Sequence, residues 1–309
     1  MRIKASLNSD KKQLLIEQEI VYFNNTNDTL SQILLHNWPN SFKNRKTPLS
    51  KRFIKDFRKD LYFAKKEDLG FTSIKNISIA YQNVKHQAYE DKADILEVFL
   101  LQPLKPQEST KIDLSYLVQM PSAKFTSYGA HENGYRLRYW YITPVIYNDG
   151  WQFMSNLNLD DLFEDYATFD IELKTPKVFS LSSNLKQTKQ SNETHNRYQL
   201  FGKNKKDITL NIERENTFKQ FNTAPHQIQT NIVDEELDST VIKTILNREL
   251  DFLKQYLGPL STDKILIDKA MQKKNPVYGL SQIPDFFSPF PHLFKYDLQL
   301  FKVLSRKYL

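Results

Sequence analysis

The sequence from Ile265 to Phe290, ILIDKAMQKKNPVYGLSQIPDFFSPF, decides how the C-terminal part of the chain folds. It opens on a short apolar run, 265–267, which follows a long amphipathic segment closed by Gly258-Pro259. This order predicts a helix, a stop signal and a buried strand. In the next segment, 275–279, a proline removes a backbone donor and a glycine permits positive φ. Both features are typical of an edge strand that leaves a sheet.

Upstream of this stretch, the α/β pattern reaches back to a polar, proline-containing segment at 222–227. A strand is predicted over 228–233, and Asp238 or Ser239 is expected to cap the helix that follows. The residues that this helix is expected to pack are Val241, Ile242, Ile245, Leu246, Glu249, Phe252, Leu253 and Leu257. A last helix is predicted over 296–309. We therefore place a domain boundary near residue 225, with a first domain over 1–225 and the beginning of a second over 226–309.

The first domain is predicted to be an antiparallel β-sandwich. Short runs of alternating apolar and polar residues recur at about ten-residue spacing with Asn, Asp and Pro between them, as in sandwich folds. The predicted strands lie at 3–7, 14–23, 31–38, 74–81, 95–100, 110–118, 198–201 and 208–212. One helix is predicted over 48–60, with Leu49, Phe53, Ile54 and Phe57 facing the sheet. The chain is therefore expected to be mainly β.

The composition narrows the classes of partner. The net charge is +7, but the Lys and Arg residues form short, separate clusters among turn-forming residues, and no nucleic-acid-binding module accompanies them. We therefore predict no nucleic-acid partner. The absence of a run of about 18 apolar residues predicts no integral membrane segment, and no signal peptide precedes the first strand. With 7 Gly and no Cys, Gly-rich phosphate loops are disfavoured, and disulfides and thiolate metal sites are excluded.

The sequence contains no motif for metal or hydrolytic chemistry. Its 6 His are scattered, and H-E-x-x-H, which places two zinc ligands and a general base on one helix, is absent. The pattern G-x-S-x-G is absent too. The acids Asp160, Asp161, Glu164 and Asp165 are expected to share a solvated surface, whereas glycosidase carboxylates flank a sugar from opposite sides. We therefore assign no catalytic and no metal-ligating residue within the chain.

Several motifs, in consistent order along the chain, resemble those of aminopeptidase N-type zinc metallopeptidases (M1-like gluzincins), and in particular a bacterial, Bacteroidetes-like branch. They are HNWPN at 36–40 with KNRKTPL at 43–49, WY at 140–141 with Pro144, and ATFD at 167–170 with TP at 175–176 and SN at 183–184. By residue type alone, the aromatic-rich segment 136–151 is interpreted as core. The resemblance implies a saddle-shaped antiparallel β-sandwich as N-terminal domain, followed by the first part of a thermolysin-like α/β domain.

A further match concerns the segment YGLSQ at 278–282. It is similar to the family's G-x-M-E-N segment, in which an edge strand pairs with the substrate backbone and a Glu holds the substrate's free amine. Gly279 matches the Gly, Ser281 the Met, Gln282 the Glu and Ile283 the Asn. The resemblance thus implies substrate-binding roles for Tyr278, Gly279, Leu280, Ser281 and Gln282. Gln282 accepts a hydrogen bond but carries no charge, and a charge-assisted bond contributes roughly 1.5–3 kcal/mol against about 1 for a neutral one. We therefore expect Gln282 to bind the free amine of a substrate more weakly than the family's Glu does.

The resemblance implies two functions, between which the sequence does not decide. In the first, the chain is the N-terminal part of a metallopeptidase homologue that binds peptides or unfolded polypeptide termini and is not catalytic as it stands. In the second, it is the front portion of an active zinc aminopeptidase whose H-E-x-x-H lies beyond residue 309. The final predicted helix carries no zinc ligand, so no cofactor is expected in this chain, although active members of the family bind zinc. The exported bacterial members imply a periplasmic or cell-surface location.

Overall fold

The computed structural model describes residues 1–158, 163–233, 237–260, 262–270, 296–297, 300–301 and 304–305. The chain divides into two compact units, Met1–Arg214 and Glu215–Leu309. The fold is mainly β with several antiparallel sheets, which confirms the predicted fold class. The predicted boundary near residue 225 falls in the turn of a hairpin of the second unit, and the division into functional domains stays a prediction.

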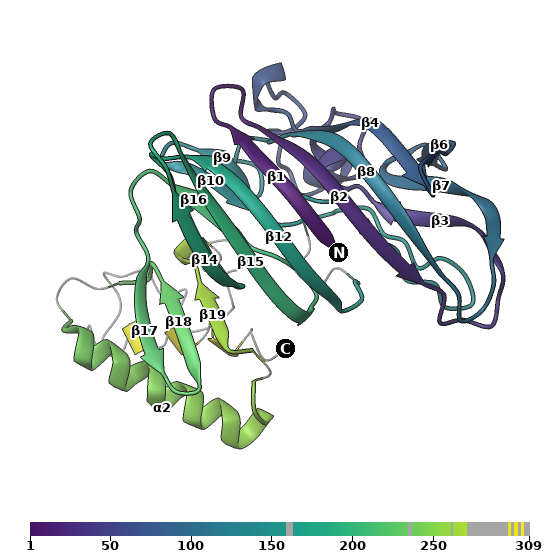
Figure 1. Cartoon of the computed structure of the whole chain (residues 1–309). Helices are drawn as coiled ribbons and strands as arrows, with labels where there is room; N and C mark the ends of the chain where they lie inside the picture. The colour runs from purple at the N-terminus through teal and green to yellow at the C-terminus, as the bar shows by residue number, and fades with distance from the viewer. Residues whose placement is uncertain are drawn as a thin grey trace. The chain divides into compact units, whose positions relative to one another are not determined.

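The first unit is built on an eight-stranded sheet with the order β14-β15-β12-β1-β2-β8-β4-β5 (Figure 1). Its strands are β1 (Arg2–Asn8), β2 (Gln13–Phe23), β4 (Phe71–Ile79), β5 (Gln82–Asn83), β8 (Ser109–Gln119), β12 (Ala167–Pro176), β14 (Lys186–Ser191) and β15 (His195–Lys205). All neighbours are antiparallel except β1 and β12, which run parallel. The first strand of the chain therefore lies inside the sheet, and the Met1 amino group donates to the Thr168 carbonyl at 2.6 Å.

Two four-stranded sheets complete the first unit. One has the order β13-β16-β10-β9, with β13 (Ser180–Ser183), β16 (Leu210–Glu213), β10 (Gly134–Leu137) and β9 (Gly129–His131). The other has the order β11-β3-β7-β6, with β11 (Thr143–Pro144), β3 (Leu30–His36), β7 (Lys92–Leu104) and β6 (His86–Tyr89). Short 3-10 turns at Trp38–Phe42 and Lys66–Asp68 connect the strands.

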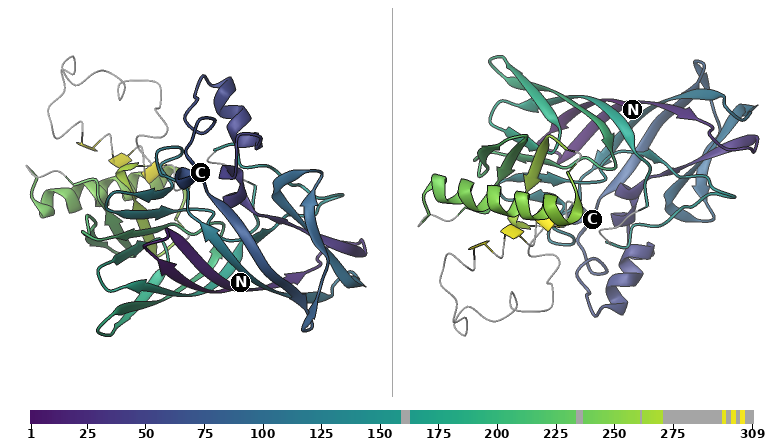
Figure 2. Two further views of the ribbon diagram at one scale, coloured as in Figure 1. Left: turned by 90° about the horizontal axis from the view of Figure 1, so that it is seen from above. Right: turned by 90° about the horizontal axis from the view of Figure 1, so that it is seen from below.

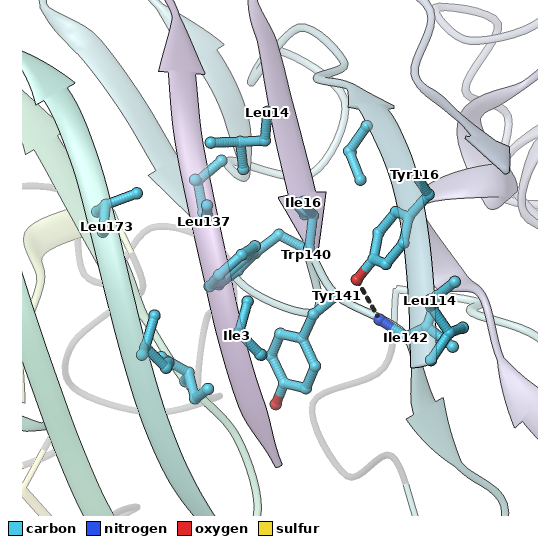
Figure 3. Packing of buried hydrophobic residues seen from close by; sticks show 14 of the residues in the cluster. Ile3, Leu14, Ile16, Leu114, Tyr116, Leu137, Trp140, Tyr141, Ile142 and Leu173 are labelled. Atoms are coloured by element: carbon cyan, nitrogen blue, oxygen red, sulfur yellow. Dashed lines mark hydrogen bonds between the residues drawn. The ribbon is translucent and has the colours of Figure 1, made fainter. Parts of the chain in front are cut away.

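One face of the eight-stranded sheet packs into the core because its strands alternate between apolar and polar residues. The inward side chains of β1, β2 and β8 join the aromatic segment after β10 in one cluster (Figure 3). Trp140 and Tyr141 are buried there, as predicted for a core segment. The Tyr116 hydroxyl accepts the Ile142 N–H at 3.2 Å, and Gln18 donates to the Ile142 carbonyl at 2.6 Å. These bonds satisfy polar groups that burial would otherwise leave unpaired.

The opposite face of the same sheet is polar. Charged side chains on neighbouring strands form cross-strand ion pairs, such as Lys111 with Glu19 at 2.8 Å and Arg2 with Asp170 at 3.7 Å. An antiparallel sheet with one apolar and one charged face is typical of a sheet that is solvated on one side.

The predicted helix at 48–60 is shorter than expected: α1 spans Pro48–Lys55. Leu49 and Phe53 are buried, as predicted, but Ile54 is 39% and Phe57 94% exposed. The helix ends in a Schellman motif. The Arg58 N–H donates a hydrogen bond to the Phe53 carbonyl, and the Phe57 N–H donates one to the Ile54 carbonyl. Phe57 takes the left-handed position (φ 59°) that usually belongs to glycine. For a residue with a Cβ this conformation costs roughly 1–2 kcal/mol.

The second unit contains a three-stranded sheet, β17-β18-β19, with a long helix along one face (Figure 1). Its elements are β17 (Lys219–Thr223), β18 (His226–Thr230), α2 (Ser239–Leu257) and β19 (Lys264–Ile267). Asp238 caps α2 and Gly258, at φ 87°, ends it, so the predicted order of helix, stop signal and buried strand is confirmed.

The packed face of α2 differs from the predicted one at four positions, because Leu250 is buried in addition and three predicted residues are exposed. Ile242, Ile245, Leu246, Glu249, Leu250 and Leu253 are buried. Val241, Phe252 and Leu257 are instead 39%, 47% and 54% exposed, because the unit covers a narrower stripe of the helix than the sequence pattern implies. Tyr296, Leu300 and Leu304, from the predicted last helix, pack into the same core and are helical. No helix in the described ranges is both long and apolar enough to cross a bilayer.

Candidate functional site

The predicted substrate-binding residues lie outside the part of the chain that the structure describes. Tyr278, Gly279, Leu280, Ser281 and Gln282 all fall within 271–295. Their roles therefore stay predictions. The structure does describe the chain that leads into them, up to Ala270.

This lead-in is a β-α-β unit whose two parallel strands end at the same edge of the sheet. β18 and β19 pair in parallel from Gln227 with Lys264 to Thr230 with Ile267. Asn231 and Asp268 follow directly after the two strands. In α/β sheets, ligands bind in the crevice outside the carboxyl ends of such strands. The predicted substrate-binding segment 278–282 therefore follows, in sequence, a sheet edge where binding residues commonly lie.

Side chains at this edge fix the chain as it leaves β19. Asn231 donates from its amide to the Asp268 carboxylate at 3.1 Å, and its own amide oxygen accepts the Lys269 N–H at 2.6 Å. Asp268, which is fully buried, also accepts the Ala270 N–H at 2.9 Å. Since hydrogen bonds to a buried carboxylate are strong, they hold residues 268–270 in one direction. The role of this cluster is to position the chain.

A second polar cluster in this unit surrounds Glu249, a carboxylate on the packed face of α2. Burial, and after it the neighbouring Asp297, raises the pKa of Glu249 to about 10, so the group is uncharged at neutral pH. Asp297 itself pairs with Arg248. The three side chains, with Phe252 and Phe301, line a cavity of about 230 Å³. That volume is below the roughly 300–1,000 Å³ of typical ligand pockets, so we do not assign a substrate to it.

The first unit has a comparable buried cluster that the sequence did not predict. Arg138 pairs with Asp207 at 2.6 Å and lies over the Tyr139 ring at 4.4 Å. Glu164 lies beside this pair and is 6% exposed, and burial raises its pKa to about 9. The expectation that the acids at 160–165 share a solvated surface is therefore wrong for Glu164. The sequence did not indicate this burial, because the charged neighbours of Glu164, Arg138 and Asp207, come from distant parts of the sequence.

The side chains that the structure describes do not fit a zinc ion. In the described ranges, no group of three or more His, Asp or Glu is placed to hold a metal. His36 is buried, stacks on Trp38 at 4.3 Å and accepts the Met154 N–H at 3.3 Å. Burial lowers the pKa of His36 to about 3, so the ring is neutral and has a structural role.

Several residues of the motifs that carry the family resemblance lie in the core of the first unit, whereas residues 43–46 are exposed. Tyr141 and Phe169, from two different motifs, meet edge to face at 5.6 Å, and Trp38 meets Tyr139 in the same way at 4.8 Å. Ser183, from the third motif, is fully buried. Residues from two of the motifs therefore meet in the core of the first unit, where they stabilise the fold.

Comparison with known proteins gives a likeness in structure alone. No protein-family profile and no curated protein matches the sequence. Among solved structures, a mutant of a two-domain M1 zinc metallopeptidase bound to L-arginine superposes with a TM-score of 0.51 at 14% identity, over 86% of this chain and 55% of that chain. The M1 zinc metallopeptidase mutant from Deinococcus radiodurans gives 0.52 at 12% identity over the same shares. The chain thus spans about half the length of these proteins, and its fold is similar to the N-terminal part of M1 zinc metallopeptidases.

Proposed function

We propose that this chain is the peptide-binding N-terminal part of an M1-like metallopeptidase homologue, and that it does not hydrolyse peptides by itself. The observation that carries the proposal is the β18–α2–β19 unit, whose fixed exit at Asp268 leads into the segment 278–282. The likeness in fold to M1 zinc metallopeptidases over 86% of the chain supports it.

Recognition is proposed to use the main chain. An extended peptide, or the terminus of an unfolded polypeptide, adds as a strand beside residues 277–279 and is held by backbone hydrogen bonds, which do not depend on the sequence of the peptide. The free amine of the peptide meets Gln282, which accepts a hydrogen bond without offering a charge. Binding should therefore discriminate little between free and blocked amino termini.

Hydrolysis of a peptide bond needs an activated water. In M1-type enzymes zinc and a general base supply it, but the 309 residues contain no H-E-x-x-H, and the described side chains do not fit the metal. We therefore derive no catalytic step for this chain. Elemental analysis is expected to find well under one zinc per chain after dialysis.

One observation favours a second candidate, the front portion of an active zinc aminopeptidase. The chain spans 55% of the length of its M1 neighbours, which leaves room in a longer protein for a zinc motif beyond residue 309. Reading the genomic sequence past this residue separates the candidates, because an H-E-x-x-H in the following helix selects the enzyme.

Binding is tested by titrating one extended peptide, in free and N-acetylated forms, by calorimetry. We expect the two affinities to agree within about fivefold, since a neutral hydrogen bond is worth only about 1 kcal/mol. Gln282→Glu should restore a preference for the free amine of about tenfold or more, because the bond becomes charge-assisted. Gln102→Glu, the same change at an exposed position of β7, is the matched control.

Catalysis is tested with a chromogenic aminoacyl-anilide and added zinc. No turnover is expected. Turnover that a chelator abolishes, or a strong preference of the unmodified chain for the free amine, would overturn the non-catalytic proposal, because the chain would then form a metal site or an amine site without the family's motif. Absence of binding to either peptide would overturn the peptide-binding proposal.

A further inference from the structure

The segment around α1, residues 43–66, concentrates the positive charge of the protein. It contains ten Lys or Arg and two Asp, a net charge of +8, whereas the whole chain has a net charge of +7. The rest of the molecule is therefore close to neutral. Lys and Arg residues occur in several clusters along the sequence, but the net positive charge comes from residues 43–66. We call this segment the α1 patch.

Most cations of the α1 patch lack an acidic partner. Arg52 pairs with Asp56 and Arg58 with Asp60. Six exposed lysines of the fully described segment 43–66 have no ion pair: Lys43, Lys46, Lys51, Lys55, Lys59 and Lys66. This contrasts with the polar face of the eight-stranded sheet, where charges of opposite sign alternate across strands. Unpaired cations in one place attract a surface that carries many negative charges.

Large apolar side chains are exposed among these lysines. Phe57 is 94%, Phe63 72% and Ile54 39% exposed. Phe57 occupies the strained left-handed position at the end of α1, where a glycine would relieve the strain. Strain that the surrounding structure maintains is often tied to function.

A buried apolar cluster supports the segment that carries these exposed side chains. Leu49, Phe53 and Leu61 pack with Phe42 and Phe125 beneath the segment. In Figure 2 the α1 segment, drawn in slate blue, projects away from the sheets of its own unit. The result is a projecting segment that carries exposed apolar side chains and exposed lysines.

We propose that the α1 patch docks the protein on a membrane surface that contains anionic lipids. Lysines meet the headgroups while Phe57, Phe63 and Ile54 enter the interface, which is the combination that interfacial anchors use. The projection of the segment from the sheets favours a bilayer over a nucleic acid, because single strands lie in basic grooves where their bases stack on aromatic rings. The aliphatic Ile54 offers nothing to a base stack but gains from burial in lipid.

Binding is tested by flotation of the full chain with vesicles of phosphatidylcholine, with and without phosphatidylserine, at low and high salt. We expect binding to the phosphatidylserine vesicles, weakened by salt. The triple variant K51E/K55E/K59E should lower the partition coefficient by about a hundredfold or more, because each basic residue near such a surface contributes roughly a factor of five. F57A/F63A should lower it by about tenfold.

Matched controls separate these effects from general changes in charge or hydrophobicity. K75E/K105E/K203E makes the same change in net charge at exposed lysines elsewhere, and Y81A removes another ring that is 94% exposed. Both should bind vesicles like the unmodified protein, and circular dichroism should show all variants folded.

Three outcomes would overturn the proposal: equal binding to vesicles without phosphatidylserine, equal loss in the control variants, or no vesicle binding. If single-stranded oligonucleotides or poly-glutamate bind the α1 patch while vesicles do not, the partner is an anionic polymer and the membrane proposal is wrong.

Discussion

Each compact unit contains an Arg–Asp ion pair beside a buried glutamate, and the two clusters differ in how far the arginine reaches into solvent. In the first unit, the side chains of Arg138 and Asp207 are 11% and 24% exposed, and Glu164 is held between elements that are distant in sequence. The cluster is enclosed on nearly all sides.

In the second unit, the side chains of Arg248 and Asp297 are 64% and 26% exposed, and a cavity of about 230 Å³ adjoins Glu249. The same three kinds of group are thus present in both places. The comparison teaches that burial of the arginine, more than the presence of an ion pair, decides whether the pair is energetically important. It can be tested separately in each unit, because all 3 Trp of the chain (Trp38, Trp140 and Trp151) lie in the first unit and report on it alone.

The largest effect is expected from Arg138→Met. It leaves Asp207 as an uncompensated, mostly buried charge and should lower the free energy of unfolding of the first unit by about 3–5 kcal/mol. Urea unfolding followed by tryptophan fluorescence measures the change. The double variant R138M/D207L removes both charges and should recover at least half of the loss. A loss below about 1 kcal/mol for Arg138→Met would show that the enclosed pair behaves like a surface pair.

A smaller effect is expected from Glu164→Gln, and it depends on pH. The pKa of Glu164 rises from 4.5 to about 9 on folding, so between these values the folded state binds the proton more tightly than the unfolded state. Stability from this group is therefore complete below about pH 4.5 and falls as the pH rises toward 9, by up to about 4 kcal/mol between pH 5 and pH 8. Gln, which cannot ionise, should remove this slope. Identical pH profiles of the two proteins would show that Glu164 ionises freely.

A similar substitution in the second unit, Glu249→Gln, should change stability in the same direction but less. Its pKa of about 10 would by itself make the effect larger. We nevertheless expect a smaller pH-dependent change in stability for Glu249→Gln than for Glu164→Gln. The reason is that the adjoining cavity admits water and the exposed Arg248 can turn toward the carboxylate as it ionises. The helix signal of α2 in circular dichroism follows this unit. A pH slope steeper than that of Glu164 would reverse our interpretation of the cavity.

The smallest effect is expected from Arg248→Met. Because the arginine is mostly in solvent, its pair with Asp297 should contribute no more than about 1 kcal/mol, and high salt should reduce this further. The measurement is urea unfolding of the second unit at two salt concentrations. A loss as large as that of Arg138→Met would remove the contrast between the two clusters.

Much of the fold is predictable from local patterns in the sequence. Strict alternation located β2 and β8, and the order of α2, Gly258 and β19 was read from helical periodicity and a glycine stop. These signals are local, so they do not specify partners. The parallel pairing of β1 with β12 depends on residues far apart in sequence, and no pattern in either strand predicts it.

The errors have the same origin. The helix predicted over 48–60 ends at Lys55 because Phe57 adopts a left-handed conformation that residue type does not indicate. Glu164 was expected in solvent because nothing in its local sequence indicates burial, and the charged neighbours Arg138 and Asp207 come near it only in the folded chain. Glu249, by contrast, was expected on the packed face of α2, since it follows the other packed residues at helical spacing, and it is buried there. The predicted substrate-binding residues 278–282 lie outside the described chain and stay a prediction.

The pairing of β1 with β12 also sets an order of events during synthesis. β2 leaves the ribosome directly after β1, but β12 begins only at Ala167. At about 5–20 residues per second, one edge of β1 waits roughly 10–30 s for its partner, with its backbone N–H and C=O groups unpaired. A nascent chain halted before residue 167 therefore exposes a strand edge that can pair with another chain, whereas one that has passed residue 176 does not. β1 is therefore made before most strands of this sheet but is among the last of them to be completed.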